Sequence, residues 1–225
     1  EGDLSGLKDS LAFGLRLTLF ITIPAMAGLL VCSTPIFSLL FMGGAFDYGK
    51  AANSAEALFY YAFGLSFVAL VRVLVPAFYA LKDTRTPVVT AFVAFLLNVG
   101  FSLALMGPLL HGGLALATTL SSLCNMALLL WLLRKKIGAF GGRRITLEGC
   151  KTLLASLPMA GVVAWGVHLI DWSRPGEKIL KGGTLFSSIA CGIGVFFLCA
   201  HLLRCEETGQ ALNMVRRKFR RGEKG

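Results

Sequence analysis

Charged residues are scarce in this chain: Asp, Glu, Lys and Arg make up 15% of the 225 residues, and only 12 residues are acidic. Soluble domains usually have about 25% charged residues, so this composition argues against a compact soluble core. The chain also lacks the ~10-residue alternating segments of a membrane β-barrel. Apolar side chains are abundant instead, at 56% of the residues, and the mean hydropathy is +0.73.

The sequence also lacks the motifs of soluble enzymes. It contains no GxSxG, no HExxH, no P-loop and no dinucleotide-binding glycine pattern, and its six cysteines show no CxxC spacing. We therefore expect no enzymatic activity and no cofactor. The formal net charge of +10 does not indicate nucleic-acid binding, because the basic residues gather at the ends of apolar segments.

Apolar stretches about 20 residues long recur along the chain, and each can cross a ~30 Å hydrocarbon layer as an α-helix. The predicted fold is an all-α, polytopic transmembrane helical bundle. Six spans are predicted, at about 11–31, 55–80, 87–106, 113–133, 150–170 and 184–203. The predicted organisation is four transmembrane helices in 1–136, a basic cytoplasmic loop at 137–149, two additional helices in 150–204, and a basic cytoplasmic tail at 205–225.

Most of the 22 Lys and Arg residues fall on one side of the predicted membrane. That side holds the N-terminal segment, the turn at 82–86, the loop after the fourth span and the tail. The opposite side holds only Lys50, Arg174, Lys178 and Lys181. Because cytoplasmic loops carry an excess of Lys and Arg, we expect both termini in the cytoplasm.

Two arginines lie inside predicted spans. Arg72 precedes the end of its span by about ten residues, which is roughly 15 Å of helical rise. An arginine near the bilayer centre costs at least ~2.5 kcal/mol, and no acidic residue lies at matching depth, so Arg72 is expected to pair with another part of the protein or to bind an anionic substrate. Arg16 lies nearer the cytoplasmic end of its span, and two interpretations stay open: snorkelling to the headgroups, or contact with an anion in a hydrated cavity.

Polar side chains occur in the third and fourth spans. Asn98 and Ser102 are spaced i, i+4 and share one helical face, and Thr118 lies in the following span. One interpretation is hydrogen bonding between helices. The other is a cation site built from amide and hydroxyl oxygens.

Several runs of residues resemble one family. They are Gly14-Leu15-Arg16-Leu17, then Leu40-Phe41 with Gly44-Ala45-Phe46, and the stretch from Gly107-Pro108-Leu109 through His111 to Thr118. The most specific run is 73–87, Val-Leu-Val-Pro-Ala-Phe-Tyr-Ala-Leu-Lys-Asp-Thr-Arg-Thr-Pro. This pattern resembles the lipid II flippase family MurJ (MviN) of the MOP exporter superfamily, over about residues 1–136. Beyond Lys136 the resemblance is mainly topological.

The resemblance implies the C-terminal portion of a fourteen-helix, two-lobed transporter of the bacterial cytoplasmic (inner) membrane. Such a protein translocates an undecaprenyl-pyrophosphate-linked peptidoglycan precursor by alternating access. The implied partners are this substrate, membrane lipids and an N-terminal lobe of the same protein, and the last two helices are expected to form a groove for the lipid tail.

For individual residues, the resemblance implies a retained cation at Arg72 and a possible sodium site at Asn98 and Thr118. Ser102 stands where that site is expected to have a carboxylate. The coupling that the resemblance implies is to Na⁺ or to the membrane potential. Two alternatives remain: a related MOP exporter of polysaccharide lipids or drugs, and a membrane scaffold subunit that does not transport.

Overall fold

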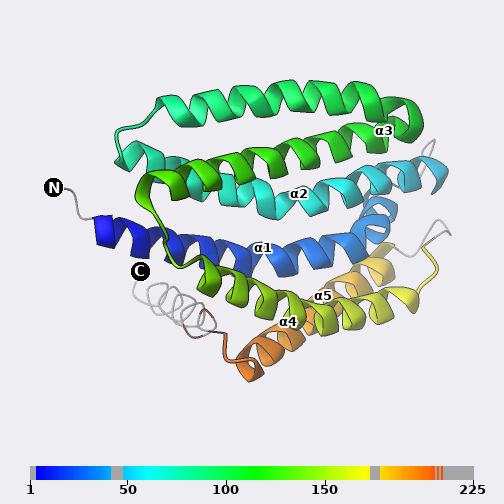
Figure 1. The fold of residues 1–225 in the computed structure, drawn as a ribbon. Coiled ribbons are helices and arrows are strands. Elements are labelled where there is room, and N and C mark those ends of the chain that lie inside the picture. Colours follow the sequence, from blue (N-terminus) through cyan, green and yellow to red (C-terminus); the bar gives the residue numbers. More distant parts are fainter. Residues whose placement is uncertain (1–3, 42–47, 173–177, 206, 208, 210–225) are drawn as a thin grey trace, which may run out of the picture.

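The computed structural model describes residues 4–41, 48–172, 178–205, 207 and 209, and this part of the chain forms long α-helices (Figure 1). The helices are α1 (Leu4–Phe41), α2 (Tyr48–Ala80), α3 (Arg85–Ile137), α4 (Gly142–His168) and α5 (Lys178–Leu202). No strand occurs among these residues. Helices suit such apolar segments because each satisfies its backbone hydrogen bonds internally when water is absent.

The third helix, α3, contains two membrane-length stretches, Arg85–Gly107 and Gly112–Ile137. Figure 1 shows its ribbon folding back on itself between them. The fold requires glycine at position 113, because a Cβ there would collide with the backbone of Leu105. Counting both arms of α3, the described residues contain six helices long and apolar enough to cross a membrane. The predicted all-α bundle of about six spans is confirmed.

Some helix ends differ from the prediction. α1 continues through Pro35 to Phe41, about ten residues beyond the predicted end of the first span at 31. α4 begins at Gly142, so residues 142–149, expected to be part of a basic loop, form its first two turns. No proline interrupts 142–149, and a helix can carry exposed basic residues where it leaves the hydrocarbon. The expected basic tail lies outside the described residues except for Cys205, Glu207 and Gly209.

Helix α1 lies between the two halves of the bundle (Figure 1). It packs against α2, α4 and α5, and α3 packs against α2. One apolar core joins Leu15 of α1 to Phe78 of α2 and Leu133 of α3. A second core joins Phe20 of α1 to Met159 of α4 and to α5. Helix α1 therefore packs both against α2, in the predicted group of four helices, and against α4 and α5, the predicted additional pair.

The ends of α2 and α5 share one capping geometry. Lys82 and Arg204 have φ of +58° and +51°. The next N–H in each case, of Asp83 and of Cys205, donates to the carbonyl of Phe78 and of Ala200 at 3.0 Å. This is the Schellman arrangement, here with a basic residue where glycine is usual. It turns the chain sharply at the ends of two membrane-length helices.

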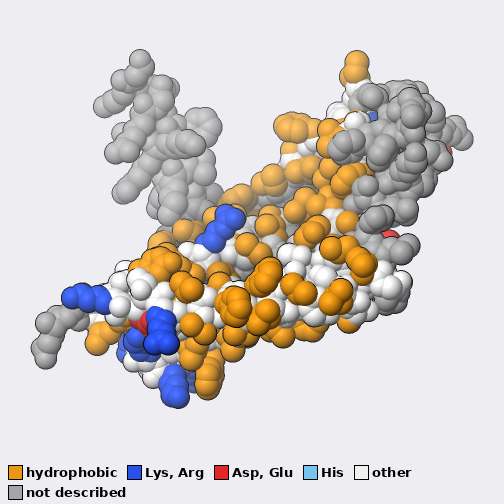
Figure 2. All heavy atoms as spheres, turned by 90° about the horizontal axis from the view of Figure 1, so that it is seen from above, with side chains coloured by type: hydrophobic (Ala, Val, Ile, Leu, Met, Phe, Trp, Pro, Cys, Tyr) orange, Lys and Arg blue, Asp and Glu red, His pale blue; other side chains and the backbone are white. Residues whose placement is uncertain are grey.

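Large apolar side chains cover the outside of the bundle. Leu103, Trp165 and Phe186 are 72%, 70% and 76% exposed. Figure 2 shows one such face, mostly hydrophobic, with Lys and Arg side chains gathered toward its left end. A soluble monomer does not carry so large a continuous apolar surface. Together with the six helices, this surface indicates a multi-pass membrane protein.

Candidate functional site

Arg72 lies on an outward face of α2. Val68, Pro76 and Tyr79 share that face by helical spacing, and all of them, like Arg72, are exposed. Arg72 precedes the end of α2 at Ala80 by eight residues, which is about 12 Å of helical rise. The ion pairs within the described part of the chain do not include it. Its guanidinium is therefore available to an anion or to another part of the protein.

A groove of about 430 Å³ lies between α1, α4 and α5. Among the described residues, no side chain that lines it is charged. Phe20 and Gly28 contribute from α1, Met159 from α4, and Ile193 and Phe196 from α5. Gly28 faces Met159 in the groove, since a Cβ there would lie 3.4 Å from the end of the Met159 side chain, an ordinary van der Waals distance. The groove is chemically suited to a hydrocarbon chain.

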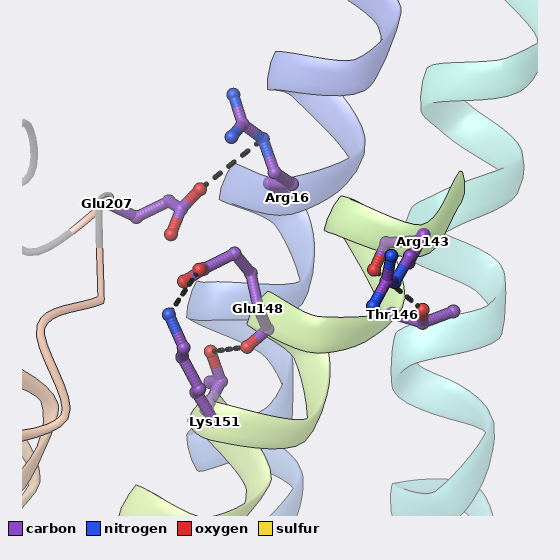
Figure 3. A network of polar contacts seen from close by, with 7 residues as sticks. Arg16, Arg143, Thr146, Glu148, Lys151 and Glu207 are labelled. Atoms are coloured by element: carbon purple, nitrogen blue, oxygen red, sulfur yellow. Dashed lines mark hydrogen bonds and ion pairs between the residues drawn. The ribbon is translucent and has the colours of Figure 1, made fainter. Parts of the chain in front are cut away.

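Arg16 lies one turn before Phe20 on α1, so it stands at one end of this groove. Its Nε lies 3.5 Å from Oε1 of Glu207, in the segment that follows α5. Only 13% of the Arg16 side chain and 2% of the Glu207 side chain are exposed. Figure 3 shows the two side chains pointing toward each other. Arg16 therefore does contact an anion, which in this structure is a carboxylate of the same chain.

One more acidic residue, Glu148, and one more basic residue, Lys151, lie beside this pair (Figure 3). Glu148 on α4 is 5% exposed and accepts a hydrogen bond of 2.7 Å from Lys151 Nζ. Burial raises the pKa of the nearby Cys205 thiol, and the Glu148 and Glu207 carboxylates raise it further, while Lys151 opposes them. This cluster was not predicted from the sequence. The signal for it was the pair of acidic residues at 206–207, just after the last span in a chain with few acids.

Asn98 and Thr118 meet across the two arms of α3. The Asn98 side-chain amide nitrogen lies 3.3 Å from Thr118 Oγ1 and 3.2 Å from Ser121 Oγ, and donates to both. The hydrogen bonds of Asn98 within the described residues do not reach Ser102, which is half-buried. The structure thus brings together Asn98 and Thr118, two of the three residues expected at a sodium site. They meet through the amide nitrogen of Asn98, not through its oxygen. The sodium site stays a prediction.

The comparison with known proteins places the chain in a family. The family model described as "Lipid II flippase MurJ" matches residues 1–177. The chain belongs to the MurJ family. A probable lipid II flippase MurJ of Rhizobium meliloti (strain 1021) is 31% identical over 227 residues, covering 98% of this chain and 41% of the relative. One of Vibrio cholerae serotype O1 is 34% identical over 202 residues, covering 86% of this chain and 38% of the relative.

The probable lipid II flippase MurJ of Rickettsia prowazekii (strain Madrid E) shows the same proportion: the match of 191 residues is 30% identical and covers 84% of this chain but 38% of the relative. The chain therefore spans about two fifths of the length of these MurJ relatives. The resemblance noted from residues 73–87 is confirmed, and the family match extends to residue 177, beyond Lys136, where the resemblance was mainly topological. These helices correspond to only part of a whole MurJ protein.

Proposed function

We propose that this chain forms the C-terminal part of a flippase that translocates lipid II across the bacterial cytoplasmic membrane. The observation that carries the proposal is Arg72, an exposed cation about 12 Å from the end of a membrane-length helix. A pyrophosphate headgroup crossing an apolar layer needs such cations. The family membership and the apolar groove of α1, α4 and α5 support the same function.

In this proposal the two ends of the substrate use different surfaces. The headgroup moves through a hydrated cavity between the Arg72 face of α2 and the N-terminal lobe of the same protein. The lipid tail stays in the groove, whose described lining residues carry no charge. Arg16, at the groove end, exchanges its contact with Glu207 for the pyrophosphate. Alternating access moves the headgroup without covalent chemistry.

The basic ends of the spans support a cytoplasmic location for both termini. Cysteine substitutions provide a test in intact cells. Arg143 lies at the start of α4 and Ile179 at the start of α5, which are opposite ends of this helix pair. A membrane-impermeant thiol reagent applied from outside should label a cysteine at 179 and leave one at 143 unlabelled. The reverse pattern would overturn the orientation.

Coupling to Na⁺ or to the membrane potential is also part of the proposal. A sodium ion bound near Asn98 and Thr118 stabilises the folded protein by mass action. The melting temperature of the intact protein should therefore be higher in NaCl than in KCl, and the difference should vanish in Asn98→Ala. An equal melting temperature in both salts would reject coupling to Na⁺ and leave coupling to the membrane potential as the proposal.

The transport role is tested by complementation of flippase-depleted cells with the intact protein. Arg72→Ala should fail to rescue growth at normal protein level, and Arg72→Lys should rescue it because the charge is retained. Arg85→Ala, which removes an exposed arginine at the first residue of α3 rather than deep within a helix, is the matched control and should rescue. Rescue by Arg72→Ala would reject the role of Arg72 and favour a scaffold.

A further inference from the structure

A second cavity, of about 630 Å³, lies between α1, α2, α3 and the turn that joins α3 to α4. We name it the α3–α4 cavity. It is separate from the groove of α1, α4 and α5, and the two have no described lining residue in common. Its inner wall is apolar and belongs to the core that joins α1, α2 and α3. The residues of that wall are Leu15, Leu19, Leu70, Leu74, Met126 and Leu130.

The outer end of the α3–α4 cavity is cationic. Arg134, in the last turn of α3, and Arg143, in the first turn of α4, both line it. Both are exposed, and neither takes part in the ion pairs within the described part of the chain. Lys8 of α1 adds a third charge nearby, since its Nζ lies 4.0 Å from the Cβ position of Gly138. The described residues that line the cavity include no Asp or Glu.

The apolar and cationic parts are aligned along one helix face. Met126, Leu130 and Arg134 follow each other at i, i+4 and i+8 on α3, so this face runs from the apolar wall to the charged end. Such a gradient matches an amphiphile with one hydrocarbon chain and an anionic head. A free phosphate ion has no hydrocarbon part that could contact the six apolar side chains of the wall, so it does not match this arrangement.

We propose that the α3–α4 cavity binds an anionic phospholipid of the surrounding bilayer. One acyl chain lies against the leucine-lined wall, and the phosphate lies between the Arg134 and Arg143 guanidinium groups, which can donate paired hydrogen bonds to phosphate oxygens. Basic pockets between membrane helices at the headgroup level bind anionic lipids for this reason. The site is distinct from the surfaces assigned above to the transported substrate.

The test is retention of lipid by the intact protein, reconstituted in nanodiscs of equimolar phosphatidylglycerol and phosphatidylcholine with identical acyl chains. After transfer to detergent, native mass spectrometry counts the bound lipids. The wild-type protein should retain phosphatidylglycerol in preference to phosphatidylcholine. The double variant Arg134→Gln/Arg143→Gln should weaken that retention roughly tenfold. The control Arg85→Gln/Arg144→Gln, which removes the same charge from two exposed arginines outside the cavity, should retain phosphatidylglycerol as the wild type does.

Two further arms separate location from charge. Ala139→Trp narrows the mouth of the cavity at an exposed position without changing the charge, and should also release phosphatidylglycerol. Inorganic phosphate should not displace the lipid. The proposal is overturned if the cavity and control double variants retain equal amounts, if both lipids are retained equally, or if phosphate alone displaces phosphatidylglycerol. Equal retention is also the result expected if another segment of the protein covers the cavity.

Discussion

The α2–α3 and α4–α5 interfaces both contain close glycine contacts, such as Gly64 against Thr119 between α2 and α3, and the α2–α3 interface adds directional bonds. Between α2 and α3, Thr119 Oγ1 donates to the Tyr60 carbonyl at 2.7 Å, and Lys136 Nζ lies 2.7 Å from Asp83 at the α2–α3 turn. Between α4 and α5, close approach depends on glycines: Gly166 faces Ser188, and Gly192 faces Val163. Hydrogen bonds and ion pairs fix how two helices are aligned along their axes, whereas glycine contacts fix the distance between the axes.

This difference fits the surfaces that each pair of helices presents. The bonded helices α2 and α3 hold Arg72 on a defined outward face, as a headgroup contact requires. The glycine-packed helices α4 and α5 form an apolar groove with α1, and a hydrocarbon chain needs no directional contact there. In the proposed function, α2 and α3 would therefore orient the headgroup, and α1, α4 and α5 would hold the lipid tail.

The largest expected effect is at Gly192. A Cβ at this position would lie 2.5 Å from Val163 Cγ2, so Gly192→Leu overpacks the α4–α5 interface. The cost should be about 1–3 kcal/mol, visible as a lower melting temperature of the purified intact protein. Gly194→Leu is the control, because no atom lies within 4 Å of a Cβ there. Equal melting temperatures for the two variants would remove the glycine contact from this account.

A smaller effect is expected at Thr119. Thr119→Val keeps the side-chain shape but removes the hydrogen bond to the Tyr60 carbonyl, which should cost about 0.6–2 kcal/mol between membrane helices. Thr184→Val is the matched control, since that hydroxyl donates to Leu180 within its own helix. Thermal unfolding of both variants measures the difference. A Thr119→Val protein as stable as Thr184→Val would show that the α2–α3 interface does not depend on this bond.

The smallest effect concerns Asp83. Hydrogen bonds from Lys136 and Thr86 hold the pKa of its carboxyl well below the usual range. The unfolded chain therefore binds a proton first as the pH falls below about 4. The contribution of Asp83 to stability is complete above that pH and decreases as the pH approaches its lowered pKa. Asp83→Asn should flatten this acid-dependent loss of unfolding stability, and Asp9→Asn, a change at an exposed carboxyl, should leave it. Parallel pH profiles for both variants would contradict the assignment.

The sequence predicted the features that depend on local length and spacing. Six apolar stretches gave six spans, and Arg72 could be located within its helix by counting residues. Contacts between distant segments were not predictable in this way. The ion pair of Arg16 with Glu207 joins α1 to the segment after α5, and only the packing of α1, α4 and α5 brings the two together. The start of α4 at Gly142 was missed because residues 142–149 are too polar to stand out as a span.

Photo-crosslinking tests most directly whether the lipid tail of the substrate occupies the groove of α1, α4 and α5. Ile193 and Leu198 are both exposed on α5, at 48% and 59%, but only Ile193 lines the groove. A photoreactive residue is placed at either position in the intact protein, which is then incubated with lipid II radiolabelled in its polyprenyl tail. The account predicts a labelled adduct at 193 and only background at 198. Equal labelling at both positions, or none at 193, would contradict it.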